Sequence, residues 1–135
     1  MEIYKTKYVV RTFDEQTMTL TSTWLNTTAE MNEDEFKAEM NALAELIFSY
    51  KAMFLLSVLN DLCFSIVPDL QAWLAKNITP KFIEARLRKQ AIIIPTDIFV
   101  MVSMKQTVED VESEKHEHQT KFFDDIQSAK NWFGK

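Results

Sequence analysis

Residues 53–74 read MFLLSVLNDLCFSIVPDLQAWL and carry the pattern that determines the expected fold. The run over 53–61 is continuously apolar until it closes on Asn60 and Asp61, which predicts a central strand covered on both faces of a sheet. Pro68 suits the first position of a helix, and apolar residues follow it at helical spacing. The segment therefore predicts a strand, a corner and a helix, as in α/β folds.

A hairpin and a long helix are expected before this segment. Residues 3–13 and 17–25 alternate in polarity, and the link at 14–16 predicts that they pair as antiparallel strands. Asn32 and Glu35 have the spacing of a capping box, and the helix that they begin should end near Tyr50 and Lys51. Its buried face is predicted to hold Phe36, Met40, Leu43 and Ile47.

Two more helices and a strand are expected after it. The helix that starts at Pro68 should break at Thr79, which can cap a second short helix. The inward side of that second helix should hold Phe82, Ile83 and Leu87. Residues 91–95, AIIIP, read as another apolar strand, and Asp97 can cap a helix over 98–102.

The chain is expected to close with a strand over 119–123 and a helix. Asp124 and Gln127 resemble a capping box for this helix. Its buried stripe is predicted to hold Ile126, Ala129, Trp132 and Phe133. The expected order ββαβα(α)βαβα predicts one α/β domain over residues 1–135, with a mixed sheet of about five strands whose later members are parallel.

Composition disfavours several classes of function. Apolar residues make up 47% of the 135 residues, enough for a globular core. Fifteen basic residues against twenty acidic ones give a net charge of -5, which disfavours a nucleic-acid partner. The single glycine, Gly134, excludes glycine-rich phosphate loops and the nucleophile elbow of hydrolases.

The same inventory predicts a cytoplasmic protein. Cys63 is the only cysteine, so no disulfide forms within the chain, and a reducing compartment is expected. The N-terminal sequence MEIYKTKYVVRTF alternates and carries charge, unlike a signal peptide. No apolar run approaches the ~20 residues that span a membrane, so membrane insertion is not expected.

Four segments, in this order of strands and helices, resemble the SpoIIAA-like branch of the STAS family (sulfate transporter and anti-sigma factor antagonist). They are the strand ending at Asp61, PDLQAWL at 68–74, AIIIPTDIF at 91–99 and FFDDIQSAKNWF at 122–133. The resemblance covers nearly the whole chain and rests on packing and capping patterns. It implies a small α/β domain with helices mostly on one sheet face. Relatives include anti-sigma factor antagonists and domains compared with the lipid-binding Sec14 fold.

The resemblance raises the possibility of a phosphorylation switch. In the family's anti-sigma factor antagonists, a serine or threonine at the start of the helix after the middle strand is phosphorylated by a partner kinase. Ser65 lies in this neighbourhood, and a helix N-terminus would stabilise a phosphate. The family signature is replaced by DLCFS at 61–65, with no glycine for the turn. This departure favours Ser65 as a cap or turn residue before Pro68.

The corner after the central strand could instead form a pocket. Asn60, Asp61 and Ser65 follow one apolar strand, and Thr96 and Asp97 follow another. If the two strands are neighbours, these polar groups converge where open α/β sheets bind ligands. The alternative, which the sequence favours, is that the carboxylates and Thr96 only cap helices and turns.

Other candidate groups have weaker sequence support. Phe99, Met101 and Met104 could form an exposed apolar patch for a protein interface or a homodimer. His116 and His118 could bind a metal from a strand, although the charged residues around them favour a solvated loop. Cys63 lies in an apolar run and is expected to be buried rather than nucleophilic.

The sequence therefore predicts a non-catalytic regulatory module that acts through a protein partner and uses no cofactor or metal. One alternative is a small-molecule or lipid carrier with a Sec14-like apolar pocket. A second alternative is an anti-sigma antagonist switched at Ser65. The candidate binding residues are Asn60, Asp61, Ser65, Thr96, Asp97, Phe99 and Met101.

Overall fold

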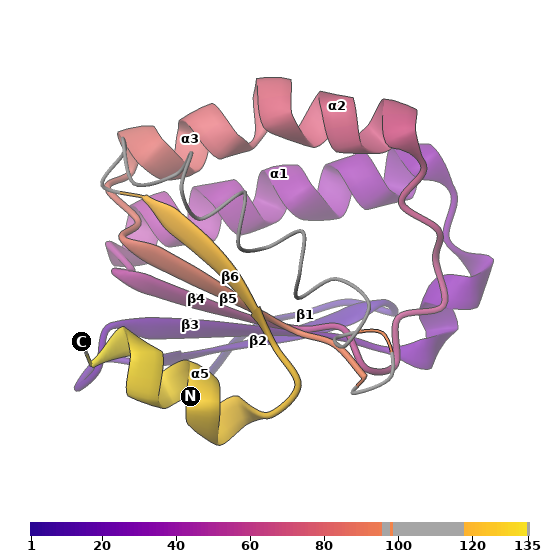
Figure 1. Cartoon of the computed structure of the whole chain (residues 1–135). Coiled ribbons are helices and arrows are strands. Elements are labelled where there is room, and N and C mark those ends of the chain that lie inside the picture. Colours follow the sequence, from indigo (N-terminus) through magenta and orange to yellow (C-terminus); the bar gives the residue numbers. More distant parts are fainter. Residues whose placement is uncertain (96–97, 99–117, 135) are drawn as a thin grey trace.

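The computed structural model describes residues 1–95, 98 and 118–134, and it shows an α/β fold built on a six-stranded mixed sheet (Figure 1). The strands lie across the sheet in the order of the sequence. Antiparallel pairing joins β1 (Glu2–Lys5), β2 (Val9–Asp14) and β3 (Thr19–Trp24). Parallel pairing joins β3 to β4 (Phe54–Val58), β5 (Lys89–Ile93) and β6 (Gln119–Phe123). The predicted α/β class is confirmed.

Helices cover both faces of the sheet, unequally. On one face lie α1 (Glu33–Tyr50), α2 (Pro68–Asn77) and α3 (Thr79–Glu84), whereas α5 (Ile126–Phe133) lies on the opposite face (Figure 1). A 3-10 helix, η1 (Asn26–Glu30), leads from β3 to α1. Two apolar cores result, a larger one under α1 to α3 and a smaller one under α5.

The sheet has one strand more than the sequence predicted, because residues 3–13 form two strands. The Thr6 hydroxyl accepts hydrogen bonds from the backbone N–H groups of Tyr8 and Val9 at 3.2 and 3.4 Å. The Thr6 N–H also donates to the Val9 carbonyl at 2.9 Å. These bonds close a turn that folds β1 back onto β2. The alternating pattern of polarity continues through the turn, so it concealed the break.

The predicted hairpin, α1 and central strand are confirmed. In the capping box of α1, the Glu35 N–H donates to Asn32 at 2.8 Å, and the Asn32 N–H donates to Glu35 at 3.0 Å. The helix ends at Tyr50, and its cap residue Lys51 has a φ of 55° in the left-handed region. On β4, Leu55 belongs to the larger core and Leu56 to the smaller one, so the strand is covered on both faces.

Two details of the predicted α3 are wrong. Thr79 does not cap this helix, because Ile78 already has helical backbone angles and serves as the cap residue. Ile83 is 45% exposed, whereas Phe82 is buried as predicted and Leu87 is buried beyond the end of the helix. Consecutive residues of a helix lie about 100° apart, so Ile83 turns away from the core beside Phe82.

The closing helix is shifted by one residue from the prediction. Asp125 rather than Asp124 caps α5, and its carboxylate accepts from the Ser128 N–H at 2.7 Å and the Ser128 hydroxyl at 2.8 Å. Ala129 and Phe133 are buried as predicted, but Ile126 is exposed because it becomes the first residue of the helix.

The helix predicted over 98–102 lies outside the described residues, apart from the exposed Ile98. Within the ranges that the structure describes, every helix is too short or too polar to cross a membrane.

Candidate functional site

The corner segment, which we define as residues 59–67, connects the end of β4 to α2. Its side chains alternate between the protein interior and the surface. Leu62, Phe64 and Ile66 are half-buried, and the residues between them are exposed. The Leu59 N–H donates to the Ile93 carbonyl at the end of β5 at 2.9 Å. The Cys63 N–H donates to the Thr28 hydroxyl at 2.8 Å. The corner segment is therefore held at both the sheet and η1, with its apolar side chains turned inward.

The polar residues predicted for this corner lie on its outer side. Asn60, Asp61 and Ser65 are exposed, and their side chains make no hydrogen bond within the described residues. The strands β4 and β5 are parallel neighbours, as the convergence hypothesis requires, and Val58 pairs with Ile93 where they end.

Four further residues predicted for this site, Thr96, Asp97, Phe99 and Met101, lie outside the described residues. Their approach to the corner segment stays a prediction.

The interpretation of Ser65 as a helix cap is wrong. Val67 is the cap residue of α2, and no side chain forms a cap hydrogen bond there. Instead, the Val67 carbonyl accepts from the N–H groups of Leu70 and Gln71 at 2.9 and 3.0 Å. Because Ser65 lies two residues before the cap residue, its hydroxyl is left exposed without that role.

The environments of Cys63 and His118 also differ from the predictions. Cys63 is exposed, because it falls on the outward side of the alternating corner segment. His118 is 8% exposed rather than solvated. Its Nδ1 lies 3.2 Å from the Leu87 carbonyl oxygen, and its Nε2 lies 3.2 Å from the Thr120 hydroxyl.

These contacts engage both ring nitrogens of His118, and His116 lies outside the described residues. Among the residues with described positions, no three metal-ligating side chains cluster.

A cavity of about 100 Å³ lies behind the corner segment, between the sheet and the helices α1 and α2. The sheet contributes Trp24, Ser57, Gln90 and Ile92 to its wall. The corner segment and α2 contribute Leu59, Leu62, Ile66 and Leu74, and α1 contributes Phe36, Met40 and Leu43. An apolar cavity of about 150 Å³ holds benzene, so this cavity suits a somewhat smaller group.

A row of stacked rings joins the corner segment to a buried cation. The Phe64 ring stacks on Phe36 at a centroid distance of 5.1 Å, and Phe36 stacks on Trp24 at 5.7 Å. The guanidinium carbon of Arg11 lies 5.8 Å from the centroid of the Trp24 ring. Because Trp24 and Phe36 also line the cavity, the stack forms one of its walls.

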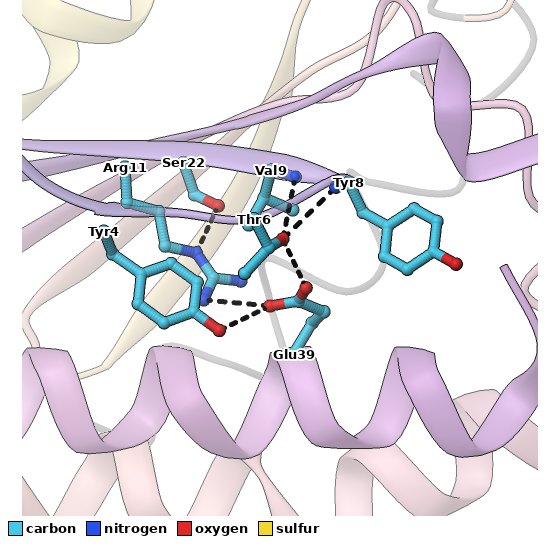
Figure 2. A network of polar contacts seen from close by, with 7 residues as sticks. All are labelled: Tyr4, Thr6, Tyr8, Val9, Arg11, Ser22 and Glu39. Atoms are coloured by element: carbon cyan, nitrogen blue, oxygen red, sulfur yellow. Dashed lines mark hydrogen bonds and ion pairs between the residues drawn. The ribbon is translucent and has the colours of Figure 1, made fainter.

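Arg11 lies at the centre of a polar network that joins β1, β2 and β3 to α1 (Figure 2). This side chain is fully buried, and its Nε donates to the Ser22 hydroxyl at 3.0 Å. Its Nη1 lies 3.9 Å from Oε1 of Glu39, which is also buried. Within the described part of the chain, Nη1 and Nη2 have no hydrogen-bond partner.

Glu39 ties the edge of the sheet to α1. Its Oε1 accepts from the Tyr4 hydroxyl at 2.8 Å, and its Oε2 accepts from the Thr6 hydroxyl at 2.6 Å (Figure 2). One turn earlier on α1, Glu35 accepts from the Tyr8 hydroxyl at 2.7 Å. Two carboxylates of α1 therefore bind β1 and the turn that follows it.

The pKa values in this network reflect burial and these hydrogen bonds. Burial lowers the pKa of Arg11 to about 10, and the negative charge of Glu39 partly offsets this by raising it. Because this pKa is well above 7, the side chain stays cationic at neutral pH. Burial raises the pKa of Tyr4, with a further contribution from Glu39. The hydrogen bond to Glu35 raises the pKa of Tyr8 to about 12. The hydrogen bond from the Asn32 N–H lowers the pKa of Glu35, and the hydrogen bond from the Tyr8 hydroxyl lowers it further.

Sequence reasoning missed this network, although a signal for it exists. Period-2 alternation places Arg11 on the same side of β2 as the buried Val9 and Phe13. Helical spacing places Glu39 on the buried face of α1. A charged residue at an inward position of each element is the pattern that could have predicted a buried ion pair.

Two of the larger hollows formed by described residues lie elsewhere. One, of about 350 Å³, lies beside α5 and is bounded in part by Thr12, Thr21, Phe54 and Phe133. The other, of about 360 Å³, lies between α1 and α3. The cavity behind the corner segment differs from both because it adjoins the residues that the sequence singled out.

The groups around this cavity suit binding, since they offer apolar contact, one hydroxyl and one amide. Comparison of the chain with models of protein families, with curated proteins and with solved structures finds no match.

Proposed function

We propose that this chain is a non-catalytic, SpoIIAA-like (STAS-like) binding module that takes up a small apolar ligand in the cavity behind the corner segment. The order of its strands and helices, with α1 to α3 on one face, supports the SpoIIAA-like assignment. The cavity adjoins the carboxyl ends of β4 and β5, where open α/β sheets bind ligands. This location favours the carrier alternative over a module that acts only through protein contacts.

The observation that carries the proposal is the apolar wall of the cavity. A ligand of about five non-hydrogen atoms binds with at most about −7.5 kcal/mol, at the ceiling of about −1.5 kcal/mol per atom. This free energy corresponds to a Kd of a few micromolar. We therefore propose reversible uptake, in which the module responds to the concentration of its ligand.

Filling the cavity should abolish uptake. Xenon binds apolar cavities of this kind, so it reports on access without a hydrogen-bonding group. In the unmodified protein, xenon should shift the backbone amide NMR signals of residues around Trp24 and Ile66 in a saturable way. In Leu62→Trp, the added indole ring should occupy the cavity and remove these shifts.

Leu62→Met is the matched control, because it keeps the side-chain volume and should keep the xenon shifts. The proposal is contradicted if xenon leaves the cavity residues of the unmodified protein unshifted. It is equally contradicted if Leu62→Trp, shown to be folded, responds to xenon as the unmodified protein does.

A second candidate function is recognition of a protein partner at the corner segment, switched at Ser65. The exposed Ser65 hydroxyl lies three residues before Pro68, and α2 begins there without a capping side chain. The first N–H groups of α2 therefore lack side-chain acceptors, which favours an added phosphate. Asn60 and Asp61 extend the same exposed surface.

Mass spectrometry tests this second candidate on protein purified gently from its own host. A phosphate-sized mass increment should map to Ser65 and disappear in Ser65→Ala. A protein partner that binds unphosphorylated chain and the Ser65→Glu variant equally well would contradict the switch.

A further inference from the structure

Ser57 and Gln90 interrupt the apolar wall that the described residues form around the cavity. Ser57 and Gln90 stand on the neighbouring strands β4 and β5, on the sheet face that α1 covers. Ser57 is 5% exposed and Gln90 is half-buried. Within the described residues, neither side chain makes a hydrogen bond. Their polar atoms are not fully buried, so they can form a hydrogen bond with water or with a ligand in the cavity.

Among the residues that the structure describes, the cavity wall has no charged side chain. The buried cation Arg11 lies on the far side of Trp24, where it packs against the indole ring and is paired with Glu39. A charged ligand would lose its hydration in this cavity without gaining an opposite charge, which is strongly unfavourable. The described part of the wall therefore favours an uncharged ligand over an anion or a cation.

We propose that the ligand is a small uncharged molecule with one hydrogen-bonding group, such as a short-chain alcohol or primary amide. Its polar group bonds to Ser57 and Gln90, and its apolar part packs against Leu62 and Ile66. A serine hydroxyl and a glutamine amide both donate and accept, so they satisfy either kind of polar group. This inference rests on the proposed function, because it names the ligand class of the same cavity.

Three probes with the same carbon chain test the charge rule. In NMR titrations, 1-butanol should shift the amide signals of the cavity residues saturably. Butyrate and butylammonium should bind at least about tenfold more weakly, because each carries a charge that the cavity cannot pair.

Variants of the two polar residues test the hydrogen bonds. Ser57→Ala and Gln90→Leu should each weaken 1-butanol binding about fivefold, the effect of one neutral hydrogen bond, and should leave the xenon shifts in place. Gln119→Leu is the matched control, since Gln119 of β6 pairs with Lys89 of β5 and this register places it on the α5 face. This control should bind 1-butanol as the unmodified protein does.

The outcomes separate the ligand class from the existence of the site. Xenon shifts together with equal binding of all three probes overturn the inference while the proposed function stands. The inference is also overturned if neither Ser57→Ala nor Gln90→Leu weakens 1-butanol binding. Absence of xenon shifts in the unmodified protein removes the proposed function, and the inference with it.

Discussion

Replacing Glu39 with alanine should lower the free energy of unfolding by about 3–5 kcal/mol, because it leaves Arg11 as a buried cation without its partner charge. Both side chains are buried, and Glu39 is also the acceptor for the hydroxyl groups of Tyr4 and Thr6. The substitution therefore removes an ion-pair partner and two hydrogen-bond acceptors together. Urea unfolding, with the slope checked for two-state behaviour, measures the loss.

Two comparisons identify the cause of this loss. Glu45→Ala, on the exposed side of α1, should change the free energy of unfolding by no more than about 0.5 kcal/mol. The double replacement of Arg11 by Met and Glu39 by Leu should recover much of the stability, because it removes both buried charges. A loss below about 1 kcal/mol in Glu39→Ala would contradict this prediction, because it would show that Arg11 can stay buried without the charge of Glu39.

Phe36→Ala should have an effect of similar size, about 3–5 kcal/mol, because it opens a large void in the core. The Phe36 ring is buried and stacks on Trp24 and Phe64, so its removal deletes two aromatic contacts. It also removes the partner that holds the corner segment against α1. Urea unfolding measures the loss, and the NMR signals of Phe64 report whether the corner segment moves.

Phe48→Ala is the matched control for this second prediction. It makes the same substitution on the same helix, at a side chain that is 68% exposed. The control should change the free energy of unfolding by no more than about 0.5 kcal/mol. Equal losses in the two variants would mean that the aromatic stack contributes little to holding the corner segment.

The parts of the fold that depend on local patterns could be predicted from the sequence. The cap at Asn32, the buried face of α1 and the start of α2 at Pro68 each follow from residues close together in the chain. The turn at Thr6 was missed because a side-chain hydrogen bond, rather than a change in polarity, reverses the chain there. The cap of α5 was predicted one residue too early, because Asp124 and Asp125 are adjacent and either residue suits a cap.

The candidate site could be predicted only in part, because it depends on which layers meet. The carboxyl end of β4 was located by a general rule for α/β sheets. That rule drew attention to Asp61 and Ser65, which proved to be exposed. The apolar residues between them, such as Leu62 and Phe64, face the cavity or the aromatic stack. The alternation in DLCFSI contains this information, but only the position of α1 shows which side is inward.

The proposed function requires that the cavity behind the corner segment bind a ligand. The most direct test is a crystal structure determined under xenon pressure. We predict xenon density enclosed by Trp24, Ser57 and Leu62, with no such density in crystals of Leu62→Trp. Density found only in the hollow bounded by Phe54 and Phe133, or none at all, would contradict the claim.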